Sequence, residues 1–336
     1  MPVTHIGDLS RTYVTRLHSA RLKTQLTQLT QEVGTGLAAQ KTQHLRGNIA
    51  PLSAIERSIE VLSSHQRAGQ EAKTLADGKQ TILGNVQDIT AQFSSALLPS
   101  AQSYQRAAFE VNASDAAAHL RAIISDLNSS VGGRALFSGT EVNTAALATA
   151  DTILADIRLA TAGSATIADF LTAVDTWFFA SGGGFETTGY QGGTDDLAPT
   201  VIGANKSVDL SQRADDTAMR NIMRDLAVVA LSTDVGLGFS VAALQSITTT
   251  SFDNLHSSMA DLTAYRAELG TAQSRIEAVL TQNSAERTAQ MMSRNALIAV
   301  DAFETATKLE NVQFQMESLY AVTARLSRLS LAAYLR

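Results

Sequence analysis

The side chains that most often carry out chemistry are sparse in this sequence, and their spacing does not suggest a site. The six histidines are His5, His18, His44, His65, His119 and His256. No two of them are four residues apart, the spacing that places two metal ligands on one helix face. The chain has no cysteine, which excludes thiolate zinc sites, disulfides and thiol nucleophiles. We therefore expect no metal site.

Two adjacent carboxylate pairs, Asp195-Asp196 and Asp215-Asp216, are the next candidates for acid–base chemistry. Neighbouring residues on a helix do not share a face, so neither pair is arranged to hold one reacting group between its members. Asp215-Asp216 comes directly before a predicted helix, where Asp is a favoured N-cap residue. We interpret both pairs as turn and capping residues.

Glycine clusters at 182–184 and 189–193 could suggest a loop that binds phosphate. The sequence has no G-x-x-x-x-G-K-[ST] pattern, and Gly236-x-Gly238 lacks the third glycine of a dinucleotide fingerprint. No G-x-S-x-G nucleophile elbow is present. We therefore predict turns at these glycines, no cofactor, no catalytic residue and no enzymatic activity.

The net charge of −6 argues against a general nucleic-acid binder. The charge is uneven: residues 1–46 hold six basic and two acidic side chains, whereas residues 140–216 hold eleven acids and three bases. No apolar stretch of about 18 residues could span a bilayer. Asp8, Arg11 and Arg16 interrupt the start of the chain, so we expect no cleaved signal peptide and no membrane association.

Helix-breaking residues are concentrated in the middle of the chain. Thirteen of the 21 glycines fall between Gly132 and Gly238, and residues 239–336 contain no proline and one glycine. This predicts long helices on both sides of an irregular middle. We expect helices at about 8–33, from Pro51 to Pro99, at 104–131, from Asp216, and across 241–333. Short strands are predicted at 185–190 and 201–210, and Trp177, Phe178 and Phe179 are predicted to form a small core there.

Both chain ends carry an apolar stripe with three- and four-residue spacing, which is typical of a helix face. The N-terminal stripe is Leu22, Leu26, Leu29 and Val33, and the C-terminal stripe is Leu309, Val312, Met316, Leu319 and Leu326. We predict that these nine residues form an assembly seam. Because such a seam needs a partner helix, we expect residues 1–40 and 295–336 to become ordered on assembly.

The predicted fold is mainly α: an elongated bundle of long amphipathic helices formed by both chain ends, with a small mixed α+β module inserted in the middle. The predicted domains are the terminal coiled-coil-like assembly helices (1–45 and 293–336), a helical bundle core (46–139 and 209–292) and an outer mixed module (140–208).

Four passages and the closing helix, in this order, resemble the bacterial flagellin superfamily. The passages are Glu32–Gly36, Gly133–Thr140, Tyr190–Gly192 followed by Val201–Gly203, and Arg266–Glu277, and the closing run is Asp301–Arg336. The Gly133–Thr140 passage is most similar to the hook-associated protein 3 family, which forms the hook–filament junction. The chain departs from the family pattern after Gly36 and at Ala135.

This resemblance implies a structural, secreted protein of bacterial motility, exported through the flagellar type III apparatus with a cytoplasmic chaperone. It implies self-association in a ring at the hook–filament junction, with hook-associated protein 1 on the hook side and flagellin on the filament side. Three alternatives stay open: flagellin itself, a coiled-coil adaptor, and a ligand-binding or enzymatic module displayed on residues 140–208.

Overall fold

A computed structural model describes the backbone of residues 4–334 and the side chains of residues 10–325. The chain is mainly α-helical, with long helices from both chain ends and short two-stranded sheets in the middle. It divides into two compact units. Unit 1 comprises residues 1–63 and 285–336, and unit 2 comprises residues 64–284.

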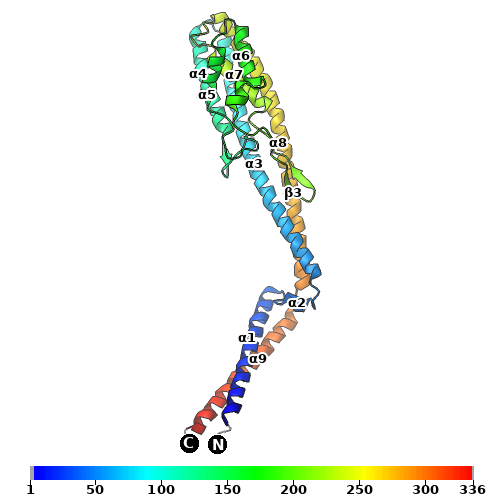
Figure 1. Cartoon of the computed structure of the whole chain (residues 1–336). Coiled ribbons are helices and arrows are strands. Elements are labelled where there is room, and N and C mark those ends of the chain that lie inside the picture. Colours follow the sequence, from blue (N-terminus) through cyan, green and yellow to red (C-terminus); the bar gives the residue numbers. More distant parts are fainter. Residues whose placement is uncertain (1–3, 335–336) are drawn as a thin grey trace. The chain divides into compact units, whose positions relative to one another are not determined.

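Unit 1 is built around two antiparallel helices from the opposite ends of the chain, α1 (Thr4–Thr35) and α9 (Ala302–Tyr334), which lie side by side (Figure 1). The unit also contains the short helix α2 (Lys41–His44), the start of α3 (Ala50–Ala101) and the end of α8 (Val241–Ile298). The predicted helix at 8–33 is therefore confirmed, and it ends where Gly36 adopts a φ of +70°.

Unit 2 is a helical bundle formed by most of α3 and α8 together with α4 (Arg106–Leu127) and α7 (Thr217–Leu231). Two shorter helices, α5 (Ala150–Thr161) and α6 (Ile167–Phe179), pack against each other, and both contact α7. Asp216 caps α7, because its carboxylate accepts a hydrogen bond of 3.1 Å from the amide of Ala218. The capping role predicted for Asp216 is confirmed.

The middle of the chain contains two short hairpins rather than the two separate predicted strands. β1 (Ser130–Val131) pairs with β2 (Arg134–Ala135), and β3 (Thr200–Gly203) pairs with β4 (Lys206–Val208). The strand expected at 185–190 is wrong, because residues Phe185–Gly189 form a π-helical turn. In that turn the ring of Phe185 is buried beside Trp177. The alternation of apolar and polar residues, on which the strand prediction rests, carries no information about this contact.

Several other helix boundaries differ from the expectation. The predicted helix at 104–131 ends at Leu127, because Gly132 and Gly133, both with positive φ, form the turn of the β1–β2 hairpin. The helix predicted across 241–333 is two helices, since residues 299–301 interrupt it. Trp177 and Phe178 are buried, as predicted, whereas Phe179 is exposed and lies outside the predicted small core.

The buried side chains of unit 2 form one continuous core. Phe170, Trp177 and Phe185 from the middle of the chain share it with Leu83 of α3 and Leu262 of α8. The three-part domain division stays a prediction, but residues 140–208 contribute to the same core as the long helices. Removing that segment would therefore expose apolar side chains of the bundle.

Buried polar side chains of α3 and α8 bind the backbone of residues 202–212, the segment that leads from the middle of the chain back to the bundle (the return segment). The ammonium of Lys79 in α3 donates to the carbonyl oxygens of Leu210 (2.6 Å) and Gln212 (2.8 Å). The amide of Asn283 in α8 donates to the carbonyl of Ile202 at 2.8 Å. Burial lowers the pKa of Lys79 to about 7, and the nearby Asp209 and Asp196 oppose this shift.

Candidate assembly surface

Seven of the nine predicted seam residues lie on the facing sides of the α1–α9 pair within one chain. Leu22, Leu26 and Leu29 of α1 are half-buried, Val312 of α9 is buried, and Leu309, Met316 and Leu319 are half-buried. This spacing of three and four residues places each set on the side of its helix that meets the other helix. Val33 is 44% exposed, and the side chain of Leu326 lies outside the described residues.

A shallow, mostly polar groove runs along one flank of this contact. Its lining consists of Gln25, Gln28, Leu29, Glu32, Lys308, Asn311, Val312 and Gln315. Glu32 is held in place because its carboxylate accepts a 2.9 Å hydrogen bond from the amide of Ala39. The hydrogen bond from Lys308 to Glu304 (2.7 Å) raises the pKa of Lys308, and the charge of Glu32 contributes a smaller effect in the same direction.

An antiparallel β-bridge between Leu37, after α1, and Ala299, before α9, keeps the two helices aligned. The amide of Ala38 donates to the carbonyl of Ile298 (2.9 Å), and the amide of Val300 donates to the carbonyl of Gly36 (3.0 Å). Asp301 then caps α9, because its side chain accepts from the amide of Glu304 at 2.8 Å. The end of α1 and the start of α9 are thus fixed at the same level.

Large apolar side chains also cover the opposite sides of both helices, and sequence reasoning missed them. Phe303 and Phe314 of α9 are 84% and 71% exposed, and Tyr13 of α1 is 69% exposed. Phe303 and Phe314 are eleven residues apart, which is close to three helical turns, and they lie opposite the buried Val312. The spacing of Phe303 and Phe314 in the sequence could have indicated a second apolar position on α9, on the side opposite the predicted stripe.

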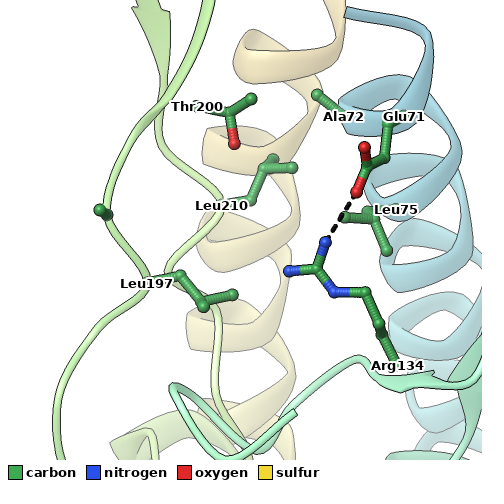
Figure 2. A pocket seen from close by; sticks show the side chains of 8 residues that line it. Glu71, Ala72, Leu75, Arg134, Leu197, Thr200 and Leu210 are labelled. Carbon is green, nitrogen blue, oxygen red and sulfur yellow. Dashed lines mark hydrogen bonds and ion pairs between the residues drawn. The ribbon is translucent and has the colours of Figure 1, made fainter. Parts of the chain in front are cut away.

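A separate hollow of about 100 Å³ lies in unit 2 (Figure 2). Leu75, Leu197 and Leu210 line it together with Arg134, whose guanidinium bonds Glu71 at 2.7 Å. Because these opposite charges neutralise each other, the hollow presents no excess charge to a ligand. It is a packing feature between α3 and the return segment.

Among the residues that the structure describes, no group of three or more His, Cys, Asp or Glu side chains is arranged to hold a metal ion. Within the same part of the chain, every helix is too short or too polar to cross a membrane.

Comparison with known proteins supplies the family context. Residues 252–335 match the model of the bacterial flagellin C-terminal helical region. The fold is similar to the solved structure of a protein proposed to be a flagellar hook-associated protein from Vibrio parahaemolyticus, with a TM-score of 0.52 and 15% identity. That match covers 73% of this chain and 95% of the other. The family match lies in the C-terminal part of the chain, and the structural match shows a similar fold. No curated protein matches the sequence.

Two of the flagellin-like passages, Gly133–Thr140 and Arg266–Glu277, have structural roles in unit 2. Leu269 and Ile276 of the Arg266–Glu277 passage are fully buried in the core, and Gln273 donates to Asp77 of α3 at 2.7 Å. Gly139 has a φ of +59°, and a Cβ there would lie 2.7 Å from the carbonyl oxygen of Gly193. The exposed aromatic side chains of α9 lie instead on unit 1, within the closing run Asp301–Arg336.

Proposed function

We propose that this protein is a structural subunit of the bacterial flagellum that forms the hook–filament junction and provides the platform on which flagellin assembles. Its copies would associate in a ring, with hook-associated protein 1 on the hook side and flagellin on the filament side. The subunit would leave the cell through the flagellar type III export apparatus, aided by a cytoplasmic chaperone. No cofactor, metal, nucleic acid or membrane takes part in this role.

The observation that carries the assembly role is the α1–α9 pair, which has an apolar inner side and large exposed aromatic side chains, Tyr13, Phe303 and Phe314, on its outer sides. Two exposed phenylalanines on one helix leave a surface that is unfavourable in water, and burying each would stabilise a contact by about 2 kcal/mol. A helix pair of this kind is suited to bundling with other copies.

Two findings favour the junction over the filament itself. The Gly133–Thr140 passage resembles the hook-associated protein 3 family, and the structural relative is described as a hook-associated protein. The flagellin alternative keeps the same surface and differs in where the protein is found. Seven of the nine predicted seam residues (all but Val33 and Leu326) would then form the inner contact that holds the helix pair together, and the pair would become fully ordered on assembly.

Immunogold labelling of detached flagella, viewed by electron microscopy, tests this function. Label confined to the hook–filament boundary is the expected result. Label along the whole filament would make the protein a flagellin. Flagella without label, from cells in which immunoblotting detects the protein, would refute the flagellar role and favour the adaptor interpretation.

A further inference from the structure

The α1–α9 pair has two outer faces that point in opposite directions. The α1 outer face consists of Tyr13, Leu17, Ala20, Thr24, Thr27 and Gln31, and the α9 outer face consists of Phe303, Thr307, Glu310, Phe314, Glu317 and Ala321. All twelve side chains are exposed, and within each face successive residues are three or four apart. Each face lies on the side of its helix opposite the inner stripe. Because the two faces point in opposite directions, one partner helix cannot contact both of them at once.

The two outer faces differ in charge. From Ser10 to Gln31, α1 contains four basic residues and no acid. Arg16 and Lys23, which are exposed, lie seven residues apart on one flank of the α1 outer face. Between Phe303 and Ala321 the α9 outer face carries Glu310 and Glu317, also seven residues apart, and the exposed Arg325 lies one turn beyond Ala321. Within the described part of the chain, neither the Arg16 and Lys23 side chains nor the two glutamates form an ion pair.

We propose that copies of this chain join head to tail, with the acidic stretch 303–321 of the α9 outer face of one copy docked on the α1 outer face of the next, along its basic flank. The proposal rests on the self-assembly in the proposed function and specifies the surfaces that carry it. Opposite charges would select the pairing of α9 with α1 and disfavour contacts between two α1 faces. The exposed aromatic side chains would supply the buried apolar area.

The spacing of the charges defines a register for this contact. Because α1 and α9 are antiparallel within a copy, copies with the same orientation place α9 antiparallel to the neighbouring α1. Seven residues span roughly 10.5 Å in any α-helix, so the two pairs of charges are equally far apart. One antiparallel register then brings Arg16 to Glu317 and Lys23 to Glu310. In that register Phe314 lies between Leu17 and Ala20 of the neighbour.

A contact between two different faces has a consequence for the assembly. A growing assembly always has one free α1 face at one end and one free α9 face at the other, so addition of copies can continue. Such heterologous contacts close into a ring when the rotation per copy divides a full turn, and otherwise produce an open helical array. Both of these outcomes are compatible with a flagellar subunit.

Disulfide trapping tests the register, and the natural absence of cysteine makes the background clean. In the proposed register Thr27 of one copy lies beside Thr307 of the next, while within one copy the two residues face away from each other. The Thr27→Cys/Thr307→Cys variant, oxidised after assembly, should give a ladder of trimers and larger species on a non-reducing gel. Each single-cysteine variant is the matched control and should not pass beyond dimers. A double variant without the ladder would overturn the register.

Charge reversal tests the pairing of the faces. In sedimentation velocity at low salt, Glu310→Lys/Glu317→Lys and Arg16→Glu/Lys23→Glu should each weaken self-association at least tenfold. Circular dichroism should show unchanged helicity, because these groups form no ion pairs with described residues. An equimolar mixture of the two variants should associate again, since each supplies the face that complements the other. Glu110→Lys/Asp115→Lys, on exposed positions of α4, is the control and should behave as wild type.

Association that persists in either single-face variant, or a mixture that fails to associate, would overturn the proposal, as would a wild-type chain that stays monomeric. These results are distinguishable from failure of the proposed function. A cysteine ladder without gold label on flagella would refute only the flagellar role. Label at the boundary without a ladder would refute only this contact.

Discussion

Asp225 is the most informative position for a test of the energetics of unit 2. Its side chain is only 1% exposed, and it accepts hydrogen bonds from Arg224 of the same helix and from Asn254 of α8 (3.2 Å). Burial raises the pKa of Asp225 from 3.8 to about 6, although Arg224 and Asn254 favour the charged form. Desolvation of the carboxylate thus exceeds the stabilisation that its partners provide.

The change in pKa predicts the effect of Asp225→Asn. A pKa difference of about two units corresponds to roughly 3 kcal/mol of cost for the charged form in the folded state. Because the folded pKa lies above the unfolded one, this cost is complete above pH 6 and declines as the pH falls towards 3.8. The Asn variant avoids it, so unit 2 should be more stable than wild type by up to about 3 kcal/mol at pH 7.5, and by about half of that at pH 5.

Urea unfolding followed by tryptophan fluorescence measures this difference. Trp177 is the single tryptophan and is buried in unit 2, so the signal reports that unit. Asp253→Asn, on an exposed position of α8, is the control and should change stability by less than about 0.5 kcal/mol at either pH. A variant that is less stable than wild type at both pH values would show that the hydrogen bonds to the carboxylate outweigh its desolvation.

Three further substitutions test the packing of each unit. Gly184→Ala would place a Cβ 1.8 Å from the Nε1 atom of Trp177 and should destabilise unit 2 by about 1–3 kcal/mol in the same urea assay, whereas Gly236→Ala, with open space around it, should not. The pKa of Lys79 is lower in the folded than in the unfolded state, so the stability of the wild type should rise by up to about 3 kcal/mol between pH 7 and 9.5. Lys79→Met should abolish this rise. A rise of equal size in the variant would show that Lys79 is not its origin. Leu319→Asp places a charge on the inner stripe of α9 and should leave the fluorescence of unit 2 unchanged while cells release unpolymerised flagellin; normal filaments would refute the seam.

Periodicity and breaker residues predicted the parts of this fold that depend on local chemistry. The inner stripes of α1 and α9, the end of α1 near Gly36 and the cap at Asp216 follow from residue types at fixed spacing. The π-helical turn at 185–189 does not, because the packing of Phe185 against Trp177 decides it. The burial of Lys79 was also unpredictable, since its two carbonyl partners lie more than 130 residues away along the chain.

The candidate surface was predicted only in part for a similar reason. Apolar spacing identifies a helix face that needs a partner, but does not say whether that partner belongs to the same chain. The structure pairs the predicted stripes with each other and leaves Tyr13, Phe303 and Phe314 exposed. Because exposure depends on which faces the fold covers, the outer faces could be recognised only after α1 and α9 had been placed together.

The pairing of α3 with α8 in unit 2 also affects how the chain is made. Lys73 bonds Glu277 at 2.9 Å across 204 residues, and Asp77 bonds Gln273 across 196. A ribosome that adds 5–20 residues per second needs roughly 10–40 s to synthesise α8 after α3. During that interval the apolar side of α3 lacks its final partner. A nascent chain of this protein therefore remains partly folded, with exposed apolar surface, for many seconds of its synthesis.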